Sequence, residues 1–201
     1  EQEELSVSYR RDYSLLQNRY IPQDSYSFTI IAYPIPEIGE DFEDIFEETV
    51  KVNTLDMEEY KQIQQHLIDA LDLGEKVHVT GRGKNHTDIW IRLHELTEPA
   101  KQTNFENCLA DVNIPVGEVF TSPKLTGTNG VLHVTQVYLN ELRYENLEFS
   151  FTDGMVTSYS CSNYEKEEEG RKYIKENILH NRETLPIGEF AIGTNTTAYV
   201  M

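Results

Sequence analysis

The chain has 201 residues, and its 35 Asp and Glu residues against 17 Lys and Arg residues give a formal net charge of −18. This length fits one large domain or one domain with part of another, and a hydrophobic share of 38% is sufficient for a packed core. Such a charge repels phosphate backbones and anionic lipids, which argues against nucleic-acid and membrane partners, and no apolar run reaches the roughly 20 residues of a membrane span.

The two cysteines, Cys108 and Cys161, have neither metal-ligand spacing nor the density of a disulfide framework. Reduced thiols and the lack of a signal peptide before the first predicted strand favour a cytoplasmic protein. The chain opens without an initiator Met and stops in the apolar run 197–201, so we expect a fragment of a longer protein.

Residues 1–74 are predicted to form a strand and helices at the end of a preceding α/β domain. The polar stretch 9–20 favours a helix, and the apolar run 28–33 favours a strand that ends at Pro34. From Asp41 onward the apolar residues fall at helical spacing, which predicts a short amphipathic helix.

A second helix of this region is marked at both ends. Asp56 and Glu59 have the spacing of a capping box, and Gly74 marks the end of the helix. Its apolar residues are expected to form one core face, with no cofactor role: Met57, Tyr60, Ile63, Leu67 and Leu71.

Residues 75–201 are predicted to form a mostly antiparallel β region with one further helix, so the expected fold class is α+β. The alternating segments 76–80 and 88–93 flank a Gly-rich turn, a pattern typical of a hairpin rather than a phosphate loop. Further strands are expected at 131–139, 147–151, 155–159 and 187–194, with a two-residue turn at Asp153-Gly154 and a helix at 165–179.

One pattern occurs twice in this region, as IPVGEVF at residues 114–120 and as LPIGEFA at residues 185–191. Pro fixes φ and Gly permits a bulge, so Glu118 and Glu189 are each expected to project from a rigid strand start. A carboxylate is costly to bury there unless it is paired, hydrogen-bonded or metal-bound. Two acids presented alike indicate a shared site, although two ordinary surface glutamates would give the same sequence.

The pair of carboxylates is compatible with two chemistries. Carboxylates bind hard or borderline cations, and in a two-metal site they hold ions that activate a water molecule. Alternatively, one Glu serves a glycosidase as acid and the other as base or nucleophile. The sequence does not give the separation of the two groups and leaves both open.

Histidines would be the natural co-ligands of a metal, yet none of the six forms a recognisable ligand pair. His133, on the strand after the first motif, is the one candidate to examine. Cys108 has no partner histidine at a recognisable spacing, so a nucleophilic cysteine is not expected.

The segment NIPVGEVFTSP at 113–123 closely resembles a signature of the thermophilic aminopeptidases, peptidase family M29. GEFAIGTN at 188–195 resembles the second signature of that family, and 85–93 is similar to the segment that precedes the first. The resemblance covers at least 77–200, and 28–73 is similar to the preceding region of a long clostridial-type branch of the family.

The resemblance implies that Glu118 and Glu189 are ligands of a centre of two divalent ions (Zn, Co or Mg), with Asn113 and Thr121 as second-shell or pocket residues. It also implies removal of amino-terminal residues from peptides, and a possible homodimer. The family's remaining ligands, histidines and an aspartate, and its catalytic tyrosine follow the second signature. The 201-residue chain is therefore expected to be inactive alone and at best a weak metal binder. A non-catalytic interaction or structural domain of the same ancestry is the main alternative.

Overall fold

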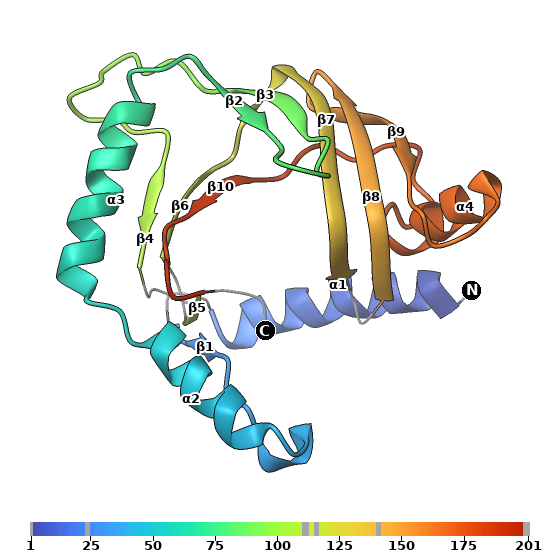
Figure 1. Cartoon of the computed structure of the whole chain (residues 1–201), viewed down its shortest axis with the longest axis horizontal. Helices are drawn as coiled ribbons and strands as arrows, with labels where there is room; N and C mark the ends of the chain where they lie inside the picture. The colour runs from blue at the N-terminus through green and yellow to red at the C-terminus, as the bar shows by residue number, and fades with distance from the viewer. Residues whose placement is uncertain (1, 23–24, 110–112, 115–116, 140–141, 199–201) are drawn as a thin grey trace. The chain divides into compact units, whose positions relative to one another are not determined.

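The computed structural model describes residues 2–22, 25–109, 113–114, 117–139 and 142–198 (Figure 1). It forms two compact units: Glu1–Thr54 with Ala110–Val116, and Leu55–Leu109 with Gly117–Met201. Helices and mostly antiparallel strands confirm the α+β class. The second helix predicted within 1–74 belongs to the larger unit, and the domain boundary at residue 74 stays a prediction.

The first unit holds two helices and a small parallel pair of strands. These elements are α1 (Gln2–Tyr20), β1 (Ile30–Ile31), the 3-10 helix η2 (Pro36–Ile38), α2 (Phe42–Asn53) and β5 (Asn113–Ile114). Both predicted helices are confirmed. The strand expected over 28–33 is shortened to β1, which pairs in parallel with β5.

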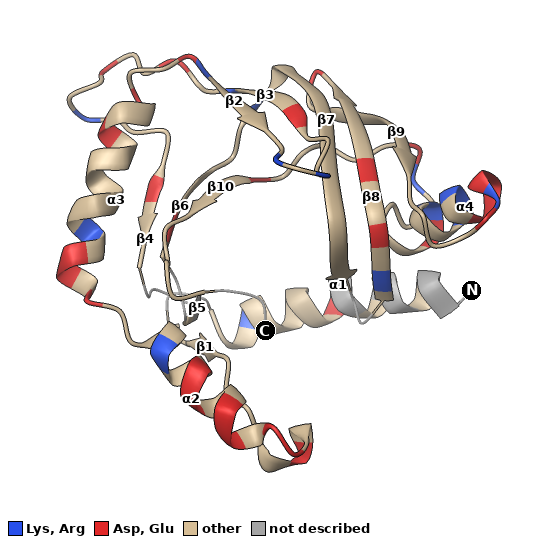
Figure 2. Cartoon of the chain, in the orientation of Figure 1, with Lys and Arg blue, Asp and Glu red and all other residues tan. Residues whose placement is uncertain are grey.

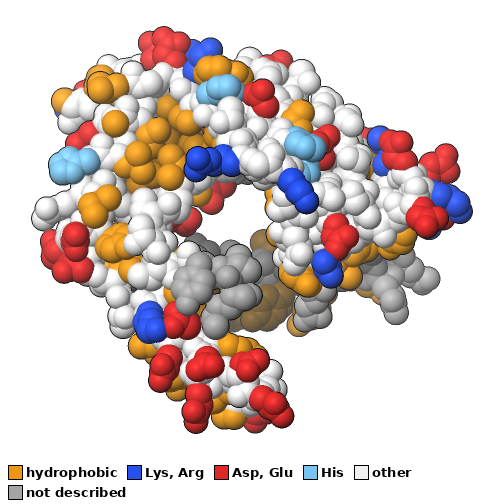
Figure 3. All heavy atoms as spheres, viewed as in Figure 1, with side chains coloured by type: hydrophobic (Ala, Val, Ile, Leu, Met, Phe, Trp, Pro, Cys, Tyr) orange, Lys and Arg blue, Asp and Glu red, His pale blue; other side chains and the backbone are white. Residues whose placement is uncertain are grey.

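Helix α2 is amphipathic, as its sequence predicts. The Phe46 ring lies 5.7 Å from that of Phe42 and edge-on to Tyr33 at 5.6 Å, whereas the acids of the helix are displayed to solvent (Figures 2 and 3). The aromatic side therefore supplies the packing within this unit.

The second unit begins with α3 (Met57–Leu71), whose start is as predicted: the Asp56 carboxylate accepts a hydrogen bond from the Glu59 N–H at 3.0 Å. The predicted core face is wrong at two positions, because Met57 and Ile63 are 40% and 49% exposed. The fully buried positions of the helix are Gln64 and Ile68. Leu67 and Leu71 pack beside them against the core.

Five antiparallel strands form the larger sheet, in the order β2-β3-β7-β8-β9. Their bounds are Lys76–Thr80, Asp88–Arg92, Lys124–Leu139, Leu142–Thr152 and Met155–Ser160. Asp153 and Gly154 have φ values of 46° and 72°, as a type I′ turn requires, and this confirms the predicted hairpin. The long β7–β8 pair extends well beyond its predicted bounds.

Three short antiparallel strands form a second sheet, in the order β10-β6-β4. Their bounds are Phe190–Gly193 for β10, Glu118–Thr121 for β6 and Glu106–Cys108 for β4. Val119 of β6, which is fully buried, packs in one cluster with Ile68 of α3, Leu93 and Phe105. Helix α3 thus covers one face of this sheet.

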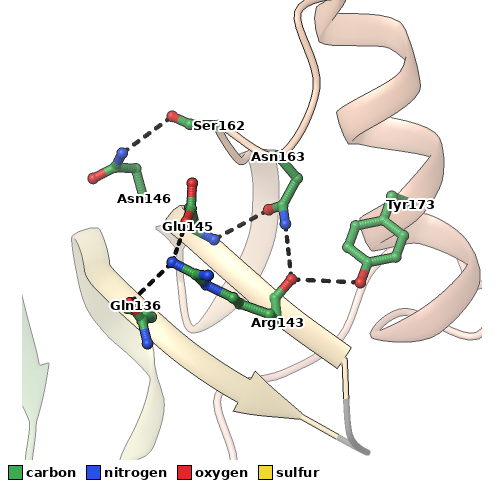
Figure 4. A network of polar contacts seen from close by, with 7 residues as sticks. All are labelled: Gln136, Arg143, Glu145, Asn146, Ser162, Asn163 and Tyr173. Carbon is green, nitrogen blue, oxygen red and sulfur yellow. Dashed lines mark hydrogen bonds and ion pairs between the residues drawn. The ribbon is translucent and has the colours of Figure 1, made fainter.

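Helix α4 (Glu167–Asn177) packs on β8 through a third apolar cluster that contains Tyr144 and Ile174. Polar contacts fasten the same region (Figure 4): the Asn163 amide donates to the Arg143 carbonyl at 2.8 Å and accepts from the Glu145 N–H at 3.1 Å. The Tyr173 hydroxyl of α4 donates to the same carbonyl at 3.4 Å. None of the helices in the described part of the chain has the length and apolar character needed to cross a membrane.

Candidate functional site

The two motif glutamates stand on neighbouring strands. Glu118 is the first residue of β6, and Glu189 directly precedes β10. The two strands pair antiparallel, with Glu118 opposite Gly193 and Phe120 opposite Ala191. Because the strands run in opposite directions, the glutamates lie at opposite ends of the pair.

Both glutamates belong to the same face of the sheet. Side chains alternate along a strand, so Glu118 and Phe120 share a face with Gly193 and Ala191, and Glu189 continues that alternation. Val119 and its partner Ile192 point to the opposite face, which is packed on the core. Figure 1 shows β6 and β10 side by side with α3 beyond β4. The glutamates therefore occupy the side of the sheet away from the core.

This face is open to solvent around Glu189. Ala191 and Glu189 are exposed, and no heavy atom lies within 4 Å of the place where a Cβ would stand on Gly193 or Gly188. Glu118 is half-buried. A ligand can therefore approach the strand pair from this side.

The spacing of the glutamates bears on what they can hold. Glu189 lies four residues from Gly193, the partner of Glu118, and a rise of about 3.3 Å per residue places the two Cα atoms about 13 Å apart along the strands. A metal–oxygen bond is about 2.1 Å, and the ions of a two-metal site are about 3.5–4 Å apart. Side chains that lean towards each other along the strands can bring both carboxylates to one metal centre, of one ion or of two.

The third strand adds acidity to the same face. Cys108 is the partner of Glu118, and Glu106 is the partner of Phe120, so both lie on the side of the glutamates. Acidic positions on β4 and β6 are visible in Figure 2. The positions of this face include no Lys or Arg, so the face attracts cations.

Carboxylates on one open face have the chemistry to bind divalent cations, but they are not a complete metal centre. Among the described residues, no group of three or more His, Cys, Asp or Glu side chains is arranged to hold a metal ion. Glu118 and Glu189 have the donor chemistry of contributing ligands.

The two copies of the motif differ in structure. Gly117 has a φ of +153°, and a Cβ there would stand 3.0 Å from the Asn195 Cβ. Its carbonyl accepts hydrogen bonds from the N–H groups of Thr194 and Asn195, at 2.6 and 3.2 Å. Gly188 has no positive φ and no close neighbour. Gly is required by the backbone in the first copy and is not required in the second.

The second copy instead links the two sheets. Pro186 forms an isolated antiparallel bridge with Met155, and the Ile187 N–H donates to the Gly154 carbonyl at 2.7 Å. The segment then leaves the five-stranded sheet and continues as β10 beside β6, as Figure 1 shows. Glu189 lies where this crossing ends.

A buried glutamine organises the core side of the site. Gln64 is fully buried on α3, and its Oε1 accepts from the Thr194 hydroxyl at 2.7 Å. Its Nε2 donates to the Asn107 Oδ1 at 2.7 Å and to the Cys108 carbonyl at 3.2 Å. The Asn107 amide donates in turn to the Lys61 carbonyl at 3.0 Å. The sequence pattern did not predict a role for these residues. The one available signal is helical spacing, because Gln64 is four positions from the predicted face residue Tyr60 and from the core residue Ile68.

The other predicted site residues are placed elsewhere. Thr121 is 5% exposed on the face opposite to Glu118, beside the open hollow lined by His94 and Asn104. Asn113 lies in β5, which belongs to the other unit. Thr121 is therefore not on the face of the glutamates, and the proposed roles of both residues stay predictions.

His133 has a structural environment. It is 4% exposed, its Nδ1 accepts from the His86 N–H at 3.2 Å, and the two rings stack at 4.8 Å. Its carbonyl accepts from Asn85 and Thr87. These contacts fasten the turn after β2 to β7, and His133 is part of no metal-binding group among the described residues.

Comparisons with known proteins agree with these motifs. A family model described as thermophilic metalloprotease (M29) matches residues 9–199. Among solved structures, wild-type AmpT from Thermus thermophilus has a similar fold, with a TM-score of 0.53 and 20% sequence identity over 79% of this chain. The similar region covers 39% of that chain, so the present chain spans less than half its length. No curated protein matches at a significant level.

Proposed function

Because the chain belongs to the M29 family of thermophilic metalloproteases, we propose that it is part of a metal-dependent aminopeptidase. In this proposal Glu118 and Glu189 each contribute a carboxylate to a centre of two divalent ions, with Zn, Co or Mg as candidates. The observation that carries it is the position of both glutamates on one open face of the β6–β10 pair. Side chains that lean towards each other over this face can bring both carboxylates to one centre.

The role of the chain's own residues follows from this face. Divalent ions supply a peptidase with Lewis acidity and an activated water molecule. Glu118 and Glu189 would hold such ions, while the surplus of carboxylates around them, including Glu106, favours the α-ammonium group of a peptide. The packed core beneath β6 keeps the strand rigid, so the carboxylates are presented in fixed positions.

The 201-residue chain is expected to be inactive alone. A non-catalytic interaction or structural domain of the same ancestry is the alternative. No observation favours the glycoside hydrolase that the sequence left open. A cytoplasmic location, peptide substrates and a homodimer remain predictions.

Hydrolysis of leucine p-nitroanilide with added Zn²⁺, Co²⁺ or Mg²⁺ tests the proposal. The assay compares a chain extended beyond Met201, its Glu118→Gln variant and the 201-residue chain. Metal-dependent activity in the extended chain alone is the expected result. A folded extended chain that is inactive with every metal would overturn the peptidase proposal in favour of the non-catalytic domain.

A further inference from the structure

We propose that Gln64 is a positioning residue for Glu118. From the core side of the sheet, Gln64 holds the two strands that flank Glu118. The inference rests on the proposed function, because it takes Glu118 to be a metal ligand. Gln64 contacts no group of the open face. Its effect on a ligand there passes through the backbone of β4 and the end of β10.

The register of the three-stranded sheet supplies the first step. Glu118 lies in the central strand, between Cys108 of β4 on one side and Gly193 of β10 on the other. Both neighbours of Glu118 must keep their register for its carboxylate to stay at a fixed height on the face, since a slip of one residue moves a side chain to the other face.

Gln64 binds next to both of these neighbours. Its Nε2 donates to the carbonyl of Cys108, and its Oε1 accepts from the hydroxyl of Thr194, the residue after Gly193. One side chain therefore ties the two outer strands to the same point of α3.

Thr194 extends the connection to the central strand. Its N–H donates to the Gly117 carbonyl at 2.6 Å, and Gly117 directly precedes Glu118. The path from Gln64 through Thr194 to Gly117 thus reaches the residue that sets the backbone direction of Glu118.

Burial shows why a polar side chain at this position has a particular role. Gln64 is 0% exposed, in a helix whose other buried residue is Ile68. An apolar side chain of the same size would fill the space, but it would leave the Thr194 hydroxyl and the Asn107 amide without this partner. Fully satisfied polar networks specify one arrangement of a core, whereas apolar contacts are not directional. The Gln64 network therefore fixes the register beside Glu118.

The test uses paramagnetic broadening of backbone amide signals by Mn²⁺, which reports binding near Glu118 without requiring activity. The chain extended beyond Met201 is compared with its Gln64→Met variant, which keeps the volume and removes the hydrogen bonds. Gln62→Met, at an exposed position of the same helix, is the matched control. Thr194→Val removes only one arm of the network and serves if Gln64→Met does not fold.

We expect the Mn²⁺ concentration that half-broadens the signals around Glu118 to rise by up to about tenfold in Gln64→Met, the lower end of the effect of losing a group bonded directly to a metal ligand, because Gln64 acts through the backbone. A smaller rise is expected in Thr194→Val, and none in Gln62→Met. An unchanged midpoint in folded Gln64→Met, or in Thr194→Val where only that variant folds, would overturn the positioning role alone. Broadening that is the same in the extended chain and in its Glu118→Gln variant would instead overturn the proposed function.

Discussion

Glu118 lies directly opposite Gly193 in the antiparallel β6–β10 pair, and this pairing fixes where Glu189 must be. Glu189 is four residues before Gly193, so it stands at the far end of the pair and on the same face. The recurring motif therefore does not build two equivalent sites. It places two carboxylates at the ends of one short ribbon, with Phe120 and Ala191 between them.

The structural difference between the two motif copies predicts different responses to the same substitution. Gly117→Ala introduces a side chain at a φ of +153° and 3.0 Å from the Asn195 Cβ, so we expect it to lower the free energy of unfolding by about 1–3 kcal/mol. Gly188→Ala meets open space and should change it by less than about 0.5 kcal/mol. Urea unfolding of both variants provides the measurement, and equal losses would contradict the assignment of distinct roles.

The buried hydroxyl of Tyr144 is expected to make the stability of the fold depend on pH. Burial, and then the neighbouring Tyr173, raises the pKa of its hydroxyl from 10.0 to about 12. As the pH rises above 10 the unfolded chain releases this proton while the folded chain retains it, so the contribution to stability is complete below about pH 10 and is lost towards pH 12. Tyr144→Phe lacks this contribution, so its stability should fall less over that interval.

The same variant has an expected result near neutral pH. The Tyr144 hydroxyl is buried without a hydrogen-bond partner among the described residues, so its removal should leave the stability unchanged or raise it. Denaturant unfolding near pH 7 and at about pH 11 measures both effects. Tyr138→Phe, at a residue that is 60% exposed, is the control. A clear loss of stability for Tyr144→Phe near pH 7 would show that the hydroxyl has a partner.

His133 is predicted to contribute to stability and not to metal binding. His133→Phe keeps a ring against His86 but removes the Nδ1 acceptor of the His86 N–H, so a loss of about 0.5–1.5 kcal/mol in unfolding free energy is expected. The Mn²⁺ midpoint at Glu118 should not change. A shifted midpoint in this variant would identify His133 as a residue that acts on the metal.

Much of the fold can be predicted from local sequence signals. Asp56 and Glu59 mark the start of α3, and Asp153-Gly154 form the expected turn, because caps and two-residue turns depend on residues adjacent in sequence. Strand β4 was missed, since Glu106–Cys108 is too short to show alternation. The pairing of β4 with β6 joins two segments separated in the sequence, so it is evident only in the folded sheet.

The site could be predicted only in part for the same reason. Glu118 and Glu189 are recognisable because the motif around each is local. Their relation depends on the β6–β10 register, which no local pattern specifies. Gln64 was hidden because a glutamine in a helix reads as a surface residue, and its partners Asn107 and Thr194 are far along the chain. Thr121 was expected in the site because it lies in the same motif as Glu118. It is three positions further along the strand, and this odd offset places its side chain on the opposite face.

A double-mutant cycle of Zn²⁺ affinity in the chain extended beyond Met201, measured by calorimetry on Glu118→Gln, Glu189→Gln and the double variant, tests most directly whether the two glutamates serve one metal centre. Glu167→Gln on α4 is the control for general loss of charge, because Glu167 is an exposed acid outside the site. Each single variant should weaken binding at least about tenfold, and the double variant should lose less than the sum of the two, because residues of one site are coupled. Affinities that fall no further than in Glu167→Gln, or losses that add independently, would contradict a shared centre.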